Sequence, residues 1–130
     1  MIVDTSAVLA ILLAEPEAQR IADAIEDSPL CRFPATCFLE ATMTVLGRNG
    51  EDGLRDLDLF LAHSRMEIAS FTESQARVAR DAFKRFGKGR HPAKLNFGDC
   101  IAYALAKETG EELLFKGADF AQTDIAAVPY

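Results

Sequence analysis

The chain lacks the long apolar run that a membrane-spanning helix requires. No stretch of its 130 residues contains about 18 consecutive apolar residues, the usual length of such a span. The N-terminus has no basic region ahead of an apolar one and carries an acid at position 4, unlike a secretory signal. These absences predict a cytoplasmic protein with no membrane partner.

Cysteine and histidine are both scarce. The three cysteines, Cys31, Cys37 and Cys100, are odd in number, lie in apolar surroundings and form no C-x-x-C pair. Buried reduced thiols are therefore expected, rather than a disulfide framework or a zinc site. The two histidines, His63 and His91, are too few for a histidine-rich metal site, and they provide few candidates for the base of a Ser-His-Asp triad.

Positive charge is in deficit overall but concentrated in one segment. The net charge of the chain is −6, whereas residues 77–94 carry seven cations and one acid, a net charge of +6. A basic segment on an acidic body favours a polyanion or an acidic peptide as partner. A solvated helix face is the plainer alternative. Residues 87–94 contain two glycines and a proline and are expected to form a flexible basic loop.

Short apolar strands alternate with helices along the chain. Strands are expected at 1–3, 30–33, 66–71, 113–115 and, as a short fifth strand, 125–128, and Thr5-Ser6 is expected to cap the first helix. Three glycines predict a turn over 47–53. The alternation predicts one α/β domain over residues 1–130, with a mostly parallel sheet covered by helices.

The most apolar segment after the N-terminal one, residues 95–106, begins with a polar helix start. Asn96 is suited to cap a buried helix, and Asp99 then lies in the first turn. A carboxylate there gains about 0.3–1 kcal/mol from the helix dipole, so capping alone is one explanation of Asp99. The positions of the other acids favour a functional explanation.

Four acids are expected at the carboxyl end of the sheet, where parallel sheets bind ligands. They follow the first strand, enter the helix after the second, and flank the fourth: Asp4, Glu40, Asp99 and Asp119. Two carboxylates about 4 Å apart repel by roughly 4 kcal/mol at an effective dielectric constant of about 20. A cluster therefore needs protons or a divalent cation, and oxygen ligands favour Mg²⁺ or Mn²⁺. Each acid alone could instead cap a helix or a turn, and Asp124 competes with Asp119 for the fourth place.

These segments resemble the motifs of PIN-domain nucleases. Residues 1–7, 95–100 and 114–120 resemble the first, third and fourth acidic motifs, and Glu40 fits the second. The length and coverage are similar to VapC-type ribonuclease toxins. The resemblance implies an RNA endonuclease needing Mg²⁺ or Mn²⁺, in a three-layer fold with about five strands in the order 3-2-1-4-5. It also implies a homodimer and a cognate VapB-type antitoxin whose tail blocks the acidic site.

The resemblance also implies roles for individual residues. Asp4 and Asp99 would ligate the principal Mg²⁺ directly, while Glu40 and Asp119 would bind through water or hold a second ion. Thr5 and Ser6 would orient Asp4 or a metal-bound water. Lys116 stands where many members have Asp or Asn. The expected RNA contacts are Arg85, Lys88, Arg90, Lys94 and Lys116.

Two rival functions fit parts of the same pattern. In a non-catalytic α/β binding module, the acids would cap helices and the basic segment would dock an acidic peptide. A phosphorylated receiver domain would share the size, the fold class and an acidic Mg²⁺ site. It needs an aspartate at the end of its third strand, and residues 66–71 offer none.

Overall fold

A four-stranded parallel sheet forms the centre of the computed structural model, which describes all residues from Met1 to Tyr130. Its strands are β1 (Ile2–Val3), β2 (Arg32–Pro34), β3 (Glu67–Ala69) and β4 (Leu113–Leu114), in the order β3-β2-β1-β4. Ile2 pairs with Arg32 on one side and with Leu113 on the other. Both residues of β1 are fully buried, as expected for a central strand covered on both faces.

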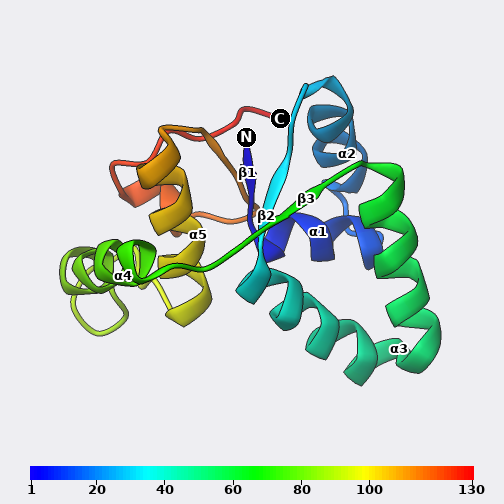
Figure 1. Ribbon diagram of the computed structural model, residues 1–130, viewed down its shortest axis with the longest axis horizontal. Helices are drawn as coiled ribbons and strands as arrows, with labels where there is room; N and C mark the ends of the chain where they lie inside the picture. The colour runs from blue at the N-terminus through cyan, green and yellow to red at the C-terminus, as the bar shows by residue number, and fades with distance from the viewer.

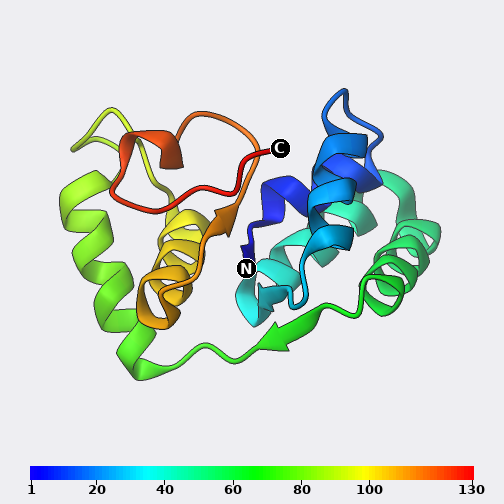
Figure 2. The ribbon, with the colours of Figure 1, turned by 90° about the horizontal axis from the view of Figure 1, so that it is seen from above.

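Five α-helices and one 3-10 turn cover the sheet. They are α1 (Thr5–Leu12), α2 (Ala18–Asp27), α3 (Ala35–His63), α4 (Glu73–Phe86), α5 (Phe97–Thr109) and η1 (Phe120–Gln122). Figures 1 and 2 show α1, α2 and α3 on one side of the strands and the α4–α5 pair on the other. The expected three-layer α/β fold is thereby confirmed, with the strand order predicted for the first four strands.

Side-chain caps define where the helices at the carboxyl end of the sheet begin. Asp4 is the N-cap of α1, and its carboxylate accepts a hydrogen bond from the Ser6 backbone N–H. The expectation that Thr5-Ser6 would cap this helix is therefore wrong, because both residues already lie within it. Asn96 caps α5 as expected, and Gly110 ends that helix with φ 70°.

Two sequence-based predictions of local structure are confirmed only in part. The break predicted over residues 47–53 is confined to a kink at Gly50, whose φ of 61° and ψ of −145° depart from helical geometry and divide α3 into two helical halves. A positive φ at one residue, which glycine adopts without steric cost, is enough to redirect the helix. The expected fifth strand is reduced to one parallel bridge between Leu113 and Ala127. Pro129 has no N–H with which to extend it.

The core is continuous and lies along both faces of the sheet. Its largest fully buried side chains include Phe33, Leu95, Tyr103 and Leu113. The three cysteines are buried free thiols. No helix is both long enough and apolar enough to cross a membrane.

Candidate acidic site at the carboxyl end of the sheet

The four predicted acids come from four different elements and converge at one end of the sheet. Asp4 follows β1, Glu40 lies in the second turn of α3, and Asp99 lies in the first turn of α5. Asp119 precedes η1 in the loop after β4. Asp99 and Glu40 lie close enough to Asp4 for their charges to raise its pKa, and Asp119 and Glu40 lie close enough to Asp99 to raise that of Asp99.

Asp4 is the most buried of these acids. Its side chain is only 4% exposed. Burial raises the pKa of Asp4 to about 6, hydrogen bonds from Ser6 oppose the rise, and the charges of Asp99 and Glu40 add to it. The folded chain therefore holds a carboxylate whose negative charge is poorly compensated.

Hydroxyl groups next to Asp4 tie the acids to the backbone. The Ser6 hydroxyl donates to Oδ2 of Asp4 at 2.6 Å and accepts a hydrogen bond from the Lys116 backbone N–H at 3.0 Å. The Thr5 hydroxyl donates to Oε2 of Glu40 at 2.7 Å. Thr5 and Ser6 thus hold two of the acids in fixed positions and link them to the loop after β4.

Asp99 has a structural role as well as a place in the cluster. Its Oδ2 accepts a hydrogen bond from the Asn96 N–H at 2.8 Å, while the Asn96 side chain accepts one from the Asp99 N–H at 2.9 Å. Burial nevertheless raises the pKa of Asp99, and the charges of Asp119 and Glu40 raise it further. A capping box alone does not account for that accumulation of negative charge.

Gly98 makes room for the Glu40 carboxylate. A Cβ atom at this position would lie 2.8 Å from Oε2 of Glu40, closer than real Cβ contacts allow. Any larger residue would push the second acid away from the start of α5. This close approach requires glycine beside Asp99 and is a feature that the sequence analysis did not identify.

The structure separates the two candidates for the fourth acid. Asp124 accepts a hydrogen bond from the Tyr103 hydroxyl at 2.6 Å and pairs with Lys107 at 3.1 Å and Arg85 at 3.3 Å. The hydrogen bond from Tyr103 is the main reason that the pKa of Asp124 falls to about 2. Asp124 is therefore fully engaged elsewhere, whereas Asp119 is exposed and adds its charge to the acidic cluster.

The donor set fits a hard divalent cation held partly through water. Every donor is a carboxylate or hydroxyl oxygen, which suits Mg²⁺ or Mn²⁺. No three His, Cys, Asp or Glu side chains lie close enough together to enclose an ion by themselves. Mg²⁺ is commonly bound by one or two carboxylates and retains several waters, so this spacing is compatible with it. The buried hydroxyl of Thr36, one turn before Glu40, also has no hydrogen-bond partner in the chain.

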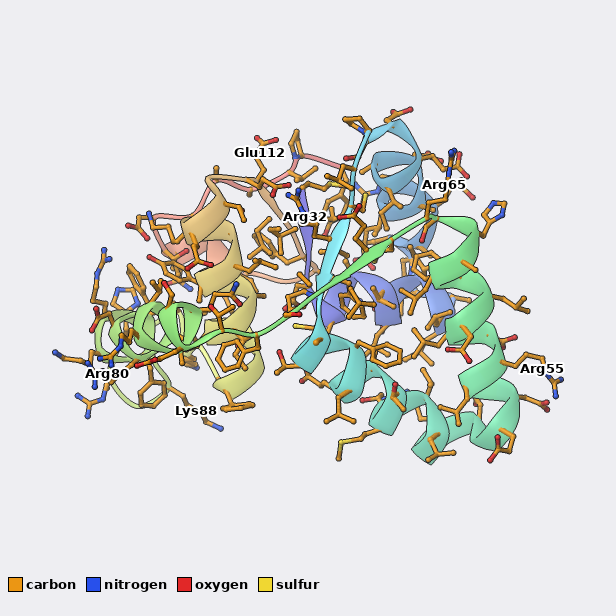
Figure 3. The ribbon with its side chains drawn as sticks, in the orientation of Figure 1. Arg32, Arg55, Arg65, Arg80, Lys88 and Glu112 are labelled. Atoms are coloured by element: carbon orange, nitrogen blue, oxygen red, sulfur yellow. The ribbon has the colours of Figure 1, made fainter.

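The predicted RNA-contacting cations fall into two groups. Arg85 is paired with Asp124, and the Lys116 ammonium is paired with Glu15 and with Glu17, so both are already engaged. Arg77 pairs with Glu73, and the other cations of the basic segment have no acidic partner: Arg80, Lys84, Lys88, Arg90 and Lys94. Figure 3 shows Arg80 and Lys88 projecting outward from α4 and the loop after it.

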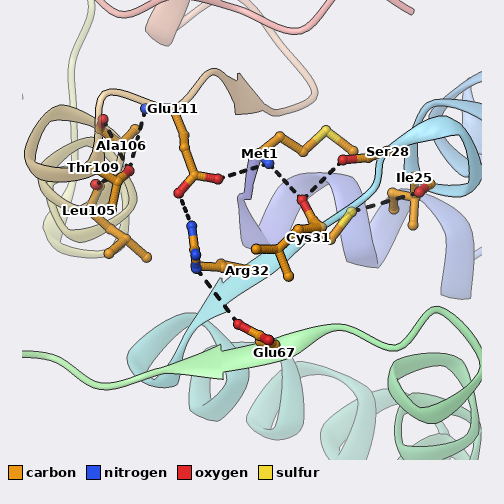
Figure 4. Close-up of polar contacts among 11 residues, drawn as sticks. Met1, Ile25, Ser28, Cys31, Arg32, Glu67, Leu105, Ala106, Thr109 and Glu111 are labelled. Carbon is orange, nitrogen blue, oxygen red and sulfur yellow. Dashed lines mark hydrogen bonds and ion pairs between the residues drawn. The ribbon is translucent and has the colours of Figure 1, made fainter.

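The opposite end of the sheet carries a charge cluster of a different kind, which the sequence analysis also missed. The amino group of Met1 donates to the Leu30 carbonyl at 2.7 Å and pairs with Glu111 at 3.0 Å (Figure 4). The Arg32 guanidinium also donates a hydrogen bond to the Glu111 carboxylate, and its Nε lies 3.7 Å from Oε2 of Glu67. These partners are far apart in sequence, so no local pattern could have revealed them.

Fold and site together define a class. A parallel, helix-covered sheet with a convergent all-oxygen acidic site is the architecture expected of a metal-assisted α/β hydrolytic domain. The PIN domain model matches residues 1–126, and the chain belongs to the PIN-domain family.

Relatives from mycobacteria narrow the family further. The chain is 46% identical over 128 residues to "Ribonuclease VapC" of Mycolicibacterium smegmatis, covering 98% of this chain and 99% of that one. It is 44% identical over 128 residues to "Ribonuclease VapC30" of Mycobacterium tuberculosis, covering 98% of each chain. Within the PIN-domain family, it therefore belongs with the VapC ribonucleases.

Solved structures agree on the fold. The crystal structure of Mycobacterium tuberculosis VapC20, described as a Sarcin-Ricin loop cleaving toxin, matches with a TM-score of 0.79 at 15% identity, over 98% of this chain and 97% of that one. A toxin–antitoxin complex from Klebsiella pneumoniae matches with a TM-score of 0.73 at 20% identity, over 99% and 97%. VapBC2 of Rickettsia felis, bound to a promoter DNA fragment, matches with a TM-score of 0.75 at 16% identity, over 98% and 96%.

Proposed function

We propose that this chain is a divalent-metal-dependent endoribonuclease, the toxin of a toxin–antitoxin pair, with its active site at the carboxyl end of the sheet. The observation that carries the assignment is the buried Asp4 carboxylate with its raised pKa, next to Asp99 and Glu40 and without a compensating cation. The VapC ribonuclease relatives supply the independent support for RNA as the substrate.

Asp4 and Asp99 are the direct ligands in this proposal. Glu40 and Asp119, which are more exposed, act through water or hold a second ion. A bound Mg²⁺ or Mn²⁺ supplies Lewis-acid stabilisation of a phosphodiester oxygen and lowers the pKa of a water. The chain's own residues set the geometry, since Ser6 orients Asp4, Thr5 orients Glu40, and the Asn96 backbone orients Asp99.

The basic segment positions the RNA backbone. Cations without an acidic partner are available to phosphates, so Lys88, Arg90 and Lys94 carry this role. Arg85 and Lys116 instead organise the protein around Asp124 and around the turn between α1 and α2. We retain the phosphate contact of Lys116, expected from the sequence, as a prediction that needs its own test.

The partners follow from the same family. We infer a cognate VapB-type antitoxin, supported by the toxin–antitoxin complexes among the structural neighbours. The homodimer implied by the sequence resemblance is a further prediction, which sedimentation of the purified chain tests. The leucine-rich half of α3 is one candidate surface, because Leu59 is 62% exposed there while Leu57 is buried in the core.

RNA cleavage by an Asp99→Asn variant tests the assignment. Asparagine keeps the size of the side chain and an oxygen that can accept the Asn96 hydrogen bond, but it removes the charge. Loss of a residue that only supports a metal ligand typically lowers activity about 10- to 100-fold, so loss of a direct ligand is expected to exceed about 100-fold.

Asp58→Asn is the matched control, because Asp58 is an exposed acid on the second half of α3 with no ion-pair partner. Its cleavage activity with Mg²⁺ should equal that of the wild type. Undiminished cleavage by Asp99→Asn would reject the assignment.

A further inference from the structure

An apolar groove lies beside the acidic site, between α4 and α5. It has a volume of about 500 Å³, and seven of its eight lining residues are hydrophobic. Three phenylalanines, contributed by the loop after β3, by α4 and by the start of α5, dominate it: Phe71, Phe83 and Phe97. Their exposed fractions are 39%, 41% and 79%. Aromatic rings left this open to water require an explanation beyond packing.

The groove and the acidic site share the first turn of α5, which supplies Phe97 to one and Asp99 to the other. Phe97 is the first residue of α5, two positions before Asp99 and next to Gly98, which contacts Glu40. Cys100 and Ile101, on the same face of α5 as Phe97, form the floor. A ligand seated against Phe97 therefore lies at the end of α5 that carries Asp99, on the side of the helix that faces α4.

The rim of the groove is cationic. Arg80 lines it directly, and the Arg90 guanidinium lies 5.9 Å from the centre of the Phe83 ring. Neither arginine has an acidic partner. On a chain whose net charge is −6, the apolar groove thus borders the one segment that carries excess positive charge, which contributes Ala79, Arg80 and Phe83 to its lining. An apolar ligand with negative groups on either side is the chemistry that this surface fits.

We infer that this groove binds an unpaired base of the RNA substrate by stacking against Phe97, while Arg80 and Arg90 hold the adjoining phosphates. The inference rests on the proposed ribonuclease function and adds a base-binding subsite to it. Aromatic platforms alternating with cations are how proteins hold single-stranded nucleic acids, because every base has an apolar face and every nucleotide a phosphate. A hydrophobic protein segment would use the aromatic rings but would leave the cationic rim without a partner.

Binding measurements in EDTA separate the subsite from catalysis. The probes are a fluorescent unstructured oligouridylate and an abasic ribose phosphate oligomer of equal length. We expect Phe97→Ala to weaken oligouridylate binding by about tenfold, the typical effect of losing one base–aromatic stack, and to leave binding of the abasic oligomer unchanged. Phe97→Leu, which keeps apolar volume but not the ring, should lose nearly as much.

Two control variants calibrate the result. Leu46→Ala removes an exposed apolar side chain, 45% exposed, from the first half of α3, and should bind both probes like the wild type. Lys88→Gln should weaken binding of both probes alike and reduce the salt dependence by about one phosphate contact.

Three outcomes would overturn the inference. The first is that Phe97→Ala binds oligouridylate as tightly as the wild type. The second is that Phe97→Ala binds both probes equally less tightly, and the third is that Phe97→Leu binds oligouridylate as tightly as the wild type. Unchanged RNA binding combined with weakened binding of a hydrophobic peptide would assign the groove to a protein partner. The binding measurements involve neither metal nor cleavage. A negative result therefore rejects the base-binding subsite without affecting the cleavage test with Asp99→Asn, and a negative cleavage test does not change the binding result.

Discussion

The two ends of the sheet treat carboxylates in opposite ways. At the amino end, Glu111 is held between the Met1 amino group and Arg32, and Glu67 lies beside the same arginine. At the carboxyl end, Asp4 stands among Asp99 and Glu40 with no cation in contact. Met1 and Asp4 are only three positions apart in the chain. They lie at opposite ends of the sheet because β1 runs between them.

The difference appears in the direction of the pKa shifts. Burial raises the pKa of Glu111, but the Met1 amino group and Arg32 outweigh burial and leave it below its ordinary value. Burial raises the pKa of Asp4 to about 6, and its acidic neighbours add to the rise. Compensated charge stabilises the fold, whereas the uncompensated charge at the carboxyl end of the sheet is what the proposed cation site predicts.

After Asp99→Asn, the largest effect on cleavage that we expect distinguishes the two candidate acids of the fourth motif. Asp119→Asn removes a charge from the acidic cluster and should lower kcat/KM for RNA cleavage by about 10- to 100-fold, as loss of an outer ligand does. Asp124→Asn should cleave almost normally, because Asp124 faces Tyr103, Lys107 and Arg85. Steady-state kinetics on a defined RNA compares them, and the reverse ranking would move the fourth acid to Asp124.

Neutralising Asp4 should stabilise the metal-free protein. A folded-state pKa of about 6 against an ordinary value of 3.8 means that ionised Asp4 lowers the free energy of unfolding above pH 6, by about 3 kcal/mol for two pKa units. Asp4→Asn retains a helix N-cap and removes this cost. In EDTA at pH 8 it should unfold at higher urea than the wild type, and the two should converge near pH 4. If Asp4→Asn were less stable than the wild type at pH 8, the ionised Asp4 carboxylate could not be an uncompensated charge.

Arg32→Met should have the opposite effect at the amino end. It leaves Glu67 unpaired and Glu111 with the Met1 amino group alone, so the free energy of unfolding should fall by about 1–2 kcal/mol at pH 7. Because the pKa of Glu111 is lowered, this stabilisation is present above its ordinary pKa and is lost as the pH falls through the folded value. Urea unfolding at pH 7 and at acidic pH measures the loss of stability and its dependence on pH. A variant as stable as the wild type at pH 7 would show that the cluster contributes nothing to stability.

The smallest expected effect concerns Lys116, which lies at the carboxyl end of the sheet but is itself paired with two acids. Lys116→Met removes the pairs with Glu15 and Glu17 and should cost about 0.5–1 kcal/mol, with RNA affinity nearly intact. Arg55→Met, which breaks an exposed pair with Asp52, is the control and should be neutral. A large loss of RNA affinity at unchanged stability would instead support the phosphate contact that the sequence predicts.

Local signals in the sequence predicted the parts of the structure that depend on local physics. Asn96 caps α5 because its side chain accepts a hydrogen bond from the Asp99 N–H, three residues later. The two residues are near neighbours in the chain, so the sequence alone predicts this cap. The strand order and the set of acids required the family resemblance as well, because strand endings alone do not say which acids meet. The turn expected at 47–53 is reduced to a kink at Gly50, because glycine permits a turn without requiring one.

Long-range pairs lay beyond any local signal. Lys116 meets Glu15 across 101 positions and Arg32 meets Glu111 across 79. The different surroundings of Asp119 and Asp124 depend on such a pair too, since Tyr103 donates a hydrogen bond to Asp124 across 21 positions. The role of Gly98 emerges only once α3 brings Glu40 against the start of α5.

Titration of Mn²⁺ into the metal-free protein by calorimetry tests the central claim most directly. A cation that binds the ionised acids must displace the proton that Asp4 holds near pH 6, so wild-type binding should release protons at pH 6 and few at pH 8. Two buffers of different ionisation enthalpy measure that release, and Asp4→Asn should lose both the saturable binding and the proton release. No saturable heat in the wild type, or equal binding by Asp4→Asn, would contradict the account.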